Sequence, residues 1–135
     1  MHAVNLPVVT ALTAGILIFI QMVLMLTVVV ARRRNRQSLS DGGKPALLQA
    51  IRRHGNFAEN AAIFIAGFAL LELMGGDRTG IEIMSAIFVV GRISHGVGLS
   101  LQSTVNIYRI AGIALTALVG FALAVRLVSI ALANF

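Results

Sequence analysis

Four long apolar runs constrain the fold of this chain more than any other feature. An α-helix rises about 1.5 Å per residue, so roughly 20 apolar residues cross a bilayer core of about 30 Å. With 58% hydrophobic and 12% charged residues, the 135-residue chain also has too little polar surface for an ordinary water-soluble domain. We therefore expect an all-α membrane protein with a single domain over residues 1–135. The predicted helices of this bundle are about 6–31, 46–74, 80–101 and 107–132.

The polar segments between these runs indicate where the helices begin and end. Pro45 suits the first position of the second helix, since a helix start leaves that backbone N–H unpaired in any case. Gly75 suits a left-handed cap after the same helix. Thr79 and Glu82 have the spacing of a capping box, which predicts Thr79 as the N-cap of the third helix. A polar strip at 102–106 separates the third helix from the fourth.

Lysine and arginine are concentrated around the first connection, whereas the second connection holds only Arg78. Because cytoplasmic loops carry the excess of basic residues, the first and third connections are predicted to be cytoplasmic and both termini to face the other side. The formal charge of +6 is thus explained by membrane topology and contact with lipid phosphates, and we expect no nucleic-acid partner. The cations follow the first run, so we expect that run to be retained and not cleaved as a signal peptide. The basic residues of the first connection and its flanks are Arg32, Arg33, Arg34, Arg36, Lys44, Arg52 and Arg53.

A polar face opens the second helix. Arg52, Asn56 and Glu59 are spaced by four and three residues, so they share one side of a helix. Arg92 and His95 share a side of the third helix at a similar depth. Unpaired charges at Glu59 and Arg92 would cost about 5–7 kcal/mol together at a helix centre. Two explanations remain open: an ion pair that fixes helix packing, or a pocket for an anionic or zwitterionic ligand.

Other features favour structural roles. His54 lies off the Arg52 face and is predicted to be a packing residue, and Arg126 is predicted to reach the far membrane interface. The chain has no cysteine, so any thiol chemistry must arrive with a substrate. No spacing typical of metal ligands is present. Close helix packing is the expected role of Gly91, Gly96, Gly98, Gly112 and Gly120.

Three motifs lie along the chain: Arg52-x-His54-x-Asn56-x-x-Glu59, Ala31-Arg32-Arg33 with Arg36 and Ser38, and Gly91-Arg92-Ile93-Ser94-His95. Together they resemble the MAPEG family, which includes microsomal glutathione transferase, prostaglandin E synthase and leukotriene C synthase. The first resembles the family signature Arg-x-x-x-Asn-x-x-Glu, the second the end of the first helix in leukotriene C synthase, and the third the Gly-Arg-x-x-His of prostaglandin E synthase. Their order and spacing agree with the family over most of the chain.

The resemblance implies a homotrimer of four-helix protomers in a bacterial inner membrane, with glutathione bound between subunits near the cytoplasmic side. Arginine forks suit the two carboxylates of the tripeptide, and Glu59 suits its ammonium group. By position, the glutathione-binding residues would be Arg32, Arg52, Asn56, Glu59, Arg92 and His95.

The implied activity is transfer of glutathione to hydrophobic electrophiles, or a peroxidase reaction, as in detoxification. Family enzymes hold the glutathione thiolate with an arginine early in the fourth helix, which makes Arg109 the candidate and Tyr108 its alternative. Arg109 aligns only with a small gap after His95, and Leu99 stands where two relatives carry tyrosine. A non-catalytic protein that binds lipid or a partner is therefore the alternative. A four-helix exporter is disfavoured, because the first helix has no carboxylate.

Overall fold

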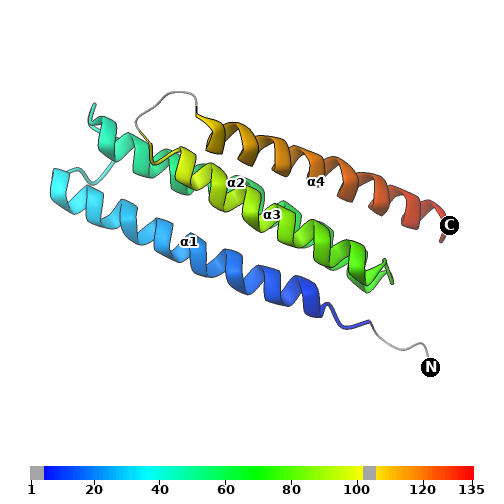
Figure 1. Ribbon diagram of the computed structural model, residues 1–135. Helices are drawn as coiled ribbons and strands as arrows, with labels where there is room; N and C mark the ends of the chain where they lie inside the picture. Colours follow the sequence, from blue (N-terminus) through cyan, green and yellow to red (C-terminus); the bar gives the residue numbers. More distant parts are fainter. Residues whose placement is uncertain (1–4, 102–105) are drawn as a thin grey trace.

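The computed structural model of this protein describes residues 5–101 and 106–135, which form four helices without strands (Figure 1). All four are long and apolar enough to cross a membrane, which confirms the predicted four-span arrangement. The first connection, the end of the third helix and the start of the fourth lie at one end of the bundle, and the second connection lies at the other end with the start of the first helix and the end of the fourth (Figure 1). The helices are α1 (Val8–Asn35), α2 (Pro45–Leu73), α3 (Arg78–Gly98) and α4 (Ile107–Leu132).

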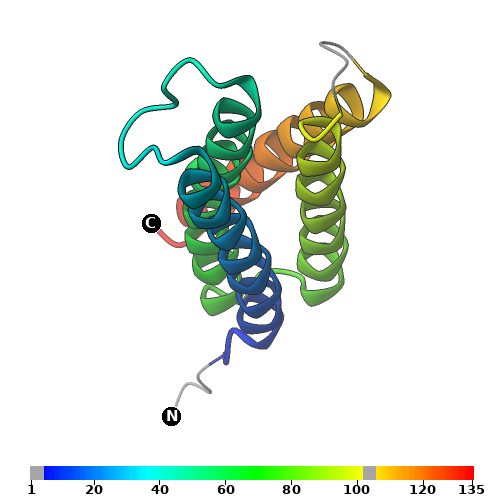
Figure 2. The same cartoon turned by 90° about the vertical axis from the view of Figure 1, so that its left-hand side faces the viewer.

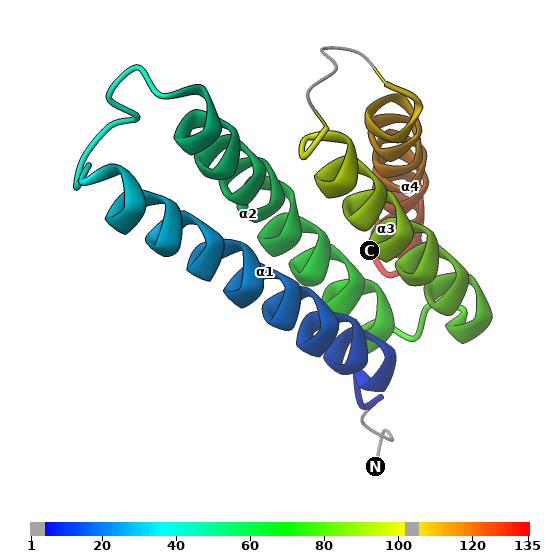
Figure 3. The ribbon, with the colours of Figure 1, turned by 60° about the vertical axis from the view of Figure 1, so that its left-hand side comes forward.

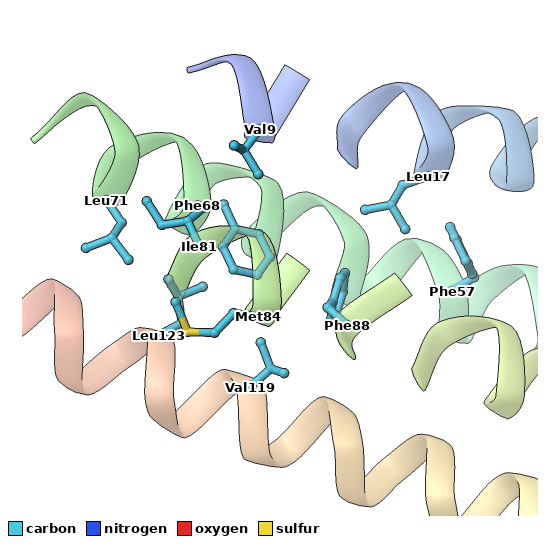
Figure 4. Close-up of a cluster of buried hydrophobic side chains, with 10 residues drawn as sticks. All are labelled: Val9, Leu17, Phe57, Phe68, Leu71, Ile81, Met84, Phe88, Val119 and Leu123. Atoms are coloured by element: carbon cyan, nitrogen blue, oxygen red, sulfur yellow. The ribbon is translucent and has the colours of Figure 1, made fainter. Parts of the chain in front are cut away.

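The helices pack tightly at the end that holds the α2–α3 connection. Among the described residues α1 packs mainly on α2 and α3 mainly on α4, while α1 and α4 do not contact each other. The rings of Phe64 and Phe88 stack with centroids 4.0 Å apart, and Phe68 lies against both rings. Most of the buried cluster comes from the half of each helix nearest that connection (Figure 4). The opposite half of the bundle holds much less buried apolar surface.

Glycines let the backbones of α3 and α4 approach each other closely. A Cβ atom on Gly112 would lie 2.6 Å from the backbone nitrogen of His95, and one on Gly98 would lie 2.6 Å from that of Arg109. The predicted packing role of these glycines, and of Gly91, is therefore confirmed. Gly96 was expected to act in the same way, but in the described part of the chain no atom of a packing partner lies within 4 Å of its Cβ position, so that prediction is wrong.

Several helix ends follow the sequence signals. Pro45 occupies the first turn of α2, and Gly75, with a φ of +80°, provides the left-handed residue that ends it. Part of the predicted polar strip, 102–105, lies outside the described residues. Asn106 caps α4 and also donates from Nδ2 to the carbonyl of Gly98 at 2.9 Å. That contact lies at the end of α3, which stops at Gly98 and not at 101 as predicted.

Two further predicted helix ends are wrong. Asp77 and not Thr79 caps α3, because its Oδ2 accepts a hydrogen bond of 2.7 Å from the backbone N–H of Gly80. The first helix continues to Asn35, four residues beyond the predicted end, and closes only where Arg36 adopts a left-handed conformation. Arg32, Arg33 and Arg34 are therefore helical.

Candidate functional site

A cleft of about 1130 Å³ lies between α2 and α4, and α3 contributes its floor. Such a volume is large enough for a drug-sized ligand. A Cβ atom on Gly67 of α2 would lie 2.8 Å from Leu123 of α4, so these helices touch there. Towards the end that holds the α1–α2 and α3–α4 connections, α2 stands away from α3 and α4 (Figures 2 and 3). The polar residues that line the cleft lie towards this end, where the basic residues gather.

The α2 side of the cleft carries the predicted polar face. Arg52, Asn56 and Glu59 all line the cleft, as their helical spacing predicted. The side chains of Arg52 and Glu59 are exposed, whereas Asn56 is half-buried. A cation, an amide and a carboxylate are thus presented along one wall.

The floor of the cleft consists of two buried polar residues of α3. Arg92 is 3% exposed and His95 is 4% exposed. Arg92 Nη2 donates to the backbone oxygen of Asn56 at 2.9 Å and to its Oδ1 at 2.6 Å, and the guanidinium lies 5.7 Å from the ring centroid of Phe57. Within the described part of the chain, Nε of Arg92 and Nδ1 of His95 have no hydrogen-bond partner. Both atoms have almost no exposed surface, so a ligand or a water would reach them only if neighbouring side chains moved.

The start of α4 contributes one of its two candidate residues. Arg109 lines the cleft, and its side chain crosses the position that a Cβ on Gly98 would take. The N–H of Arg109 is held by the side chain of Asn106 at 3.0 Å, so the first turn of α4 is fixed at this point. Tyr108 is 49% exposed and does not line the cleft, although its backbone oxygen accepts a hydrogen bond from Ser94.

Arg32 is also placed away from the cleft of its own chain. Its Nη1 atom donates to the carbonyl oxygens of Ser38 at 3.1 Å and Ser40 at 2.9 Å, both in the α1–α2 connection. Arg32 therefore shapes that connection. Of the candidate site residues, the structure brings together Arg52, Asn56, Glu59, Arg92, His95 and Arg109.

Direct ion pairs lie elsewhere in the molecule. Among the described residues they join Arg78 to Glu82 and, at 3.9 Å, Arg126 to Asp77, both at the α2–α3 end. Arg126 thus lies at the far end of the bundle, as its position in the sequence predicted. No basic group of the described chain lies within 4.0 Å of Glu59. The negative charge of Glu59 therefore attracts Arg92 from a distance, without a direct ion pair. The contact that fixes Arg92 is therefore its hydrogen bonding to Asn56 and not an ion pair.

The side of α2 that faces away from the cleft makes polar contacts of its own. The side-chain amide of Gln21 lies 2.7 Å from Nε2 of His54, which joins α1 to α2. Arg53 donates to Thr27 of α1 at 3.2 Å and to Ser100, just after α3, at 2.6 Å. His54 is thus a packing residue, as predicted. These hydrogen bonds fix the polar half of α2 on the side that faces away from the cleft.

Sequence reasoning missed a buried carboxylate and the apolar half of the cleft. Glu72 is 7% exposed and accepts bonds from the N–H groups of Val9 and Thr10 and from the Thr10 hydroxyl. The sequence did carry a signal for this site, because Glu72 is an acidic residue among the apolar residues near the end of α2. Phe64, Thr116 and Phe121 line the part of the cleft away from the arginines. They carry no sequence signal, because such residues are ordinary in membrane helices.

A four-helix membrane bundle with a cationic cleft at one end is the arrangement that the sequence motifs led us to expect. The family model described as the MAPEG family matches residues 10–129. Because the match covers most of the chain, the chain belongs to the MAPEG family.

Particular relatives place this member more closely. The chain is 32% identical over 90 residues to inner membrane protein YecN of Escherichia coli strain K12, which covers 67% of this chain and 69% of the relative. YecN of strain O6:H1 matches with the same identity and coverage. No solved structure matches the chain at a significant level. The four apolar helices and these relatives make it an integral, multi-pass inner membrane protein.

Proposed function

We propose that this protein is a glutathione-dependent membrane transferase that acts on hydrophobic electrophiles, with peroxidase activity as a related reaction. The observation that carries the proposal is the cleft, in which three arginines from three helices face one carboxylate. Glutathione carries two carboxylates, one ammonium group and a thiol. Membership of the MAPEG family supports the same assignment.

The residues of the cleft fit this ligand. A buried polar atom without a partner costs about 1–3 kcal/mol, so the free Nε of Arg92 and Nδ1 of His95 favour a ligand that bonds to them. Planar guanidinium groups such as those of Arg52 and Arg92 suit carboxylates. Glu59, which has no direct cationic partner among the described residues, suits an ammonium group.

Each residue then has a separate task. Arg92, held by Asn56, binds a carboxylate at the floor, while Arg52 and Glu59 bind the charged ends at the rim. Bound glutathione would supply a thiolate nucleophile for attack on an electrophile dissolved in the bilayer. Arg109 favours the thiolate over the thiol, because a nearby positive charge stabilises the anion. Tyr108 does not line the cleft of its own chain, so Arg109 takes this role.

Homotrimer formation and orientation are part of the same proposal. Arg32 lies outside the cleft of its own chain, so the contribution that the resemblance gives it requires a neighbouring subunit. The polar lining of the cleft lies towards the end that carries most of the basic residues. By the positive-inside rule this end faces the cytoplasm, where glutathione would enter.

The test is conjugation of glutathione to an aryl halide by purified protein in detergent. Removing one preorganised donor from a stabilised anion costs about 10²–10³ in rate, so we expect Arg109→Ala to lower kcat by about that factor. We expect its Kd for glutathione to rise by less than about tenfold, since the other cleft residues remain. Arg126→Ala, at the far end, is the matched control and should retain the wild-type rate.

Two results would contradict parts of this proposal. Conjugation by Arg109→Ala at the unmutated rate would show that another group holds the thiolate. A wild-type protein that neither conjugates glutathione nor gains thermal stability from an excess of it would favour the alternative, a non-catalytic protein that binds lipid or a partner.

A further inference from the structure

The α1–α2 connection is held in a defined shape by two of its basic residues. Arg32 bonds to the carbonyl oxygens of Gln37, Ser38 and Ser40, and Lys44 Nζ bonds to the carbonyl of Asn35 at the end of α1. These cations satisfy backbone oxygens of the connection. These two side chains therefore hold the connection in shape.

The backbone of this connection is unusual as well. Arg36 and Ser40 have φ values of 50° and 53°, and Gly42 and Gly43 have 58° and 70°. Left-handed conformations are uncommon for residues other than glycine, so surrounding contacts must hold them. The Gln37 side chain adds such a contact, since its Nε2 donates to the hydroxyl of Ser40 at 3.3 Å.

Three other cations of the segment are presented outward. Arg33, Arg34 and Arg36 are exposed, and no carboxylate of the described chain lies within 4.0 Å of their charged groups. Arg33 and Arg34 are in the last turn of α1, directly after its apolar run. That position corresponds to the headgroup level of a bilayer that α1 spans.

The connection also presents an exposed apolar side chain. Leu39 is 78% exposed, although it lies between polar residues in a connection whose backbone is held in place. A cationic surface with an exposed leucine at headgroup depth suits a phosphate group that is attached to acyl chains better than a soluble anion.

We propose that Arg33, Arg34, Arg36 and Leu39 form a binding surface for the headgroup of an anionic phospholipid. The three guanidinium groups bind the phosphate and its neighbours in the leaflet, and Leu39 inserts beside the acyl chains. Arg32 and Lys44 do not bind the lipid, because they are committed to the shape of the connection. This surface is separate from the cleft and does not depend on the proposed function.

The experiment measures lipid binding by the full-length protein in detergent, by native mass spectrometry with added phosphatidylglycerol or phosphatidylcholine. A cation near an anionic surface contributes about 1 kcal/mol, which is about fivefold in affinity, so Arg33→Gln, Arg34→Gln and Arg36→Gln together should weaken phosphatidylglycerol binding by about 100-fold. Arg78→Gln with Arg126→Gln is the control, since it removes exposed cations from the other end of the bundle. Leu39→Gln should weaken binding of phosphatidylglycerol and leave its headgroup preference unchanged.

Three results would overturn the proposal. Equal retention of phosphatidylglycerol by the triple variant would place lipid binding elsewhere, and equal retention of phosphatidylcholine by the wild type would remove the preference for anionic lipid. Competition by soluble glycerol 3-phosphate at the same concentration as the lipid would assign the surface to free anions. The melting temperature of each variant without lipid shows that the fold is intact.

Discussion

Glu72 and Arg92 are both buried charges within membrane-spanning helices, yet their surroundings differ. The carboxylate of Glu72 accepts three hydrogen bonds from the first turn of α1, and the positive end of that helix dipole faces it. Arg92 bonds to Asn56 through Nη2 alone, and its Nε has no partner among the described residues. Glu72 lies outside the cleft, whereas Arg92 lines it.

The difference separates a structural charge from one that is available to a ligand. A charge that is costly to bury is stable where its hydrogen-bonding capacity is filled, as it is for Glu72. Where part of that capacity remains unfilled beside a cavity, as for Arg92, the missing partner can come from a ligand. A mutation of Glu72 should therefore change mainly the free energy of unfolding, whereas a mutation of Arg92 should change mainly the affinity for the ligand.

The largest expected effect is at Glu72. Glu72→Ala leaves three donors at the start of α1 without their acceptor, and at about 1 kcal/mol per bond the free energy of unfolding should fall by about 3 kcal/mol. Denaturation in mixed detergent micelles measures this change. The Kd for glutathione should stay within about twofold, because distant sites behave independently. A weaker ligand affinity with unchanged stability would reverse the assigned roles.

Arg92→Met should have the next largest effect, on binding. Loss of a charged hydrogen bond costs about 2 kcal/mol, so glutathione affinity should fall by about 30-fold. The free energy of unfolding should change by less than about 1 kcal/mol, because methionine fills similar space and removes a buried charge. Calorimetric titration and a melting curve of the same preparation check both values. A variant that binds like the wild type would show that Arg92 is a structural residue like Glu72.

A smaller effect is expected where α1 meets the back of α2. Hydrogen bonds between membrane helices contribute about 0.6 kcal/mol on average and up to about 1.7 kcal/mol, so Gln21→Leu should lower the free energy of unfolding by about 1 kcal/mol. Its contact with His54 is the one removed. Denaturation of Gln21→Leu, His54→Leu and the double variant isolates the coupling between them. Additive effects would show that the two side chains do not interact.

The smallest effect is expected for the exposed pair of Arg78 and Glu82, whose side chains are 72% and 50% exposed. Pairs of this kind on a helix surface contribute about 0.3–0.5 kcal/mol. Glu82→Ala should change the free energy of unfolding by no more than this, which makes it the matched control for Glu72→Ala. A loss as large as that of Glu72→Ala would mean that removal of any acid from this end destabilises the bundle.

The sequence predicted the spans and much of the cleft for a physical reason. Apolar runs must be helical in a bilayer, and spacing by four and three residues fixes a shared face, as it does for Arg52, Asn56 and Glu59. The convergence of Arg92, His95 and Arg109 on that face followed from their depth. The positions of Tyr108 and Arg32 could not be predicted from helix spacing or depth, because turn geometry and loop contacts decide where a side chain at a helix end points.

Other features depend on contacts between distant segments. Glu72 caps a helix that begins more than sixty positions earlier, and helix periodicity holds no information about such a partner. The spacing of Thr79 and Glu82 matched a capping box. In the folded chain, however, the N–H of Gly80 donates to the side chain of Asp77, which makes Asp77 the N-cap. The apolar depth of the cleft around Phe64 arises from the divergence of α2 and α4, which is a property of packing.

The most direct test of the account is a structure of the protein determined in the presence of glutathione. We expect density for the tripeptide in the cleft, with one carboxylate bound to Arg92 beside Asn56, its ammonium group bound to Glu59 and its sulfur near Arg109. A cleft that contains only lipid or detergent at saturating glutathione, or glutathione bound away from Asn56 and Glu59, would contradict it.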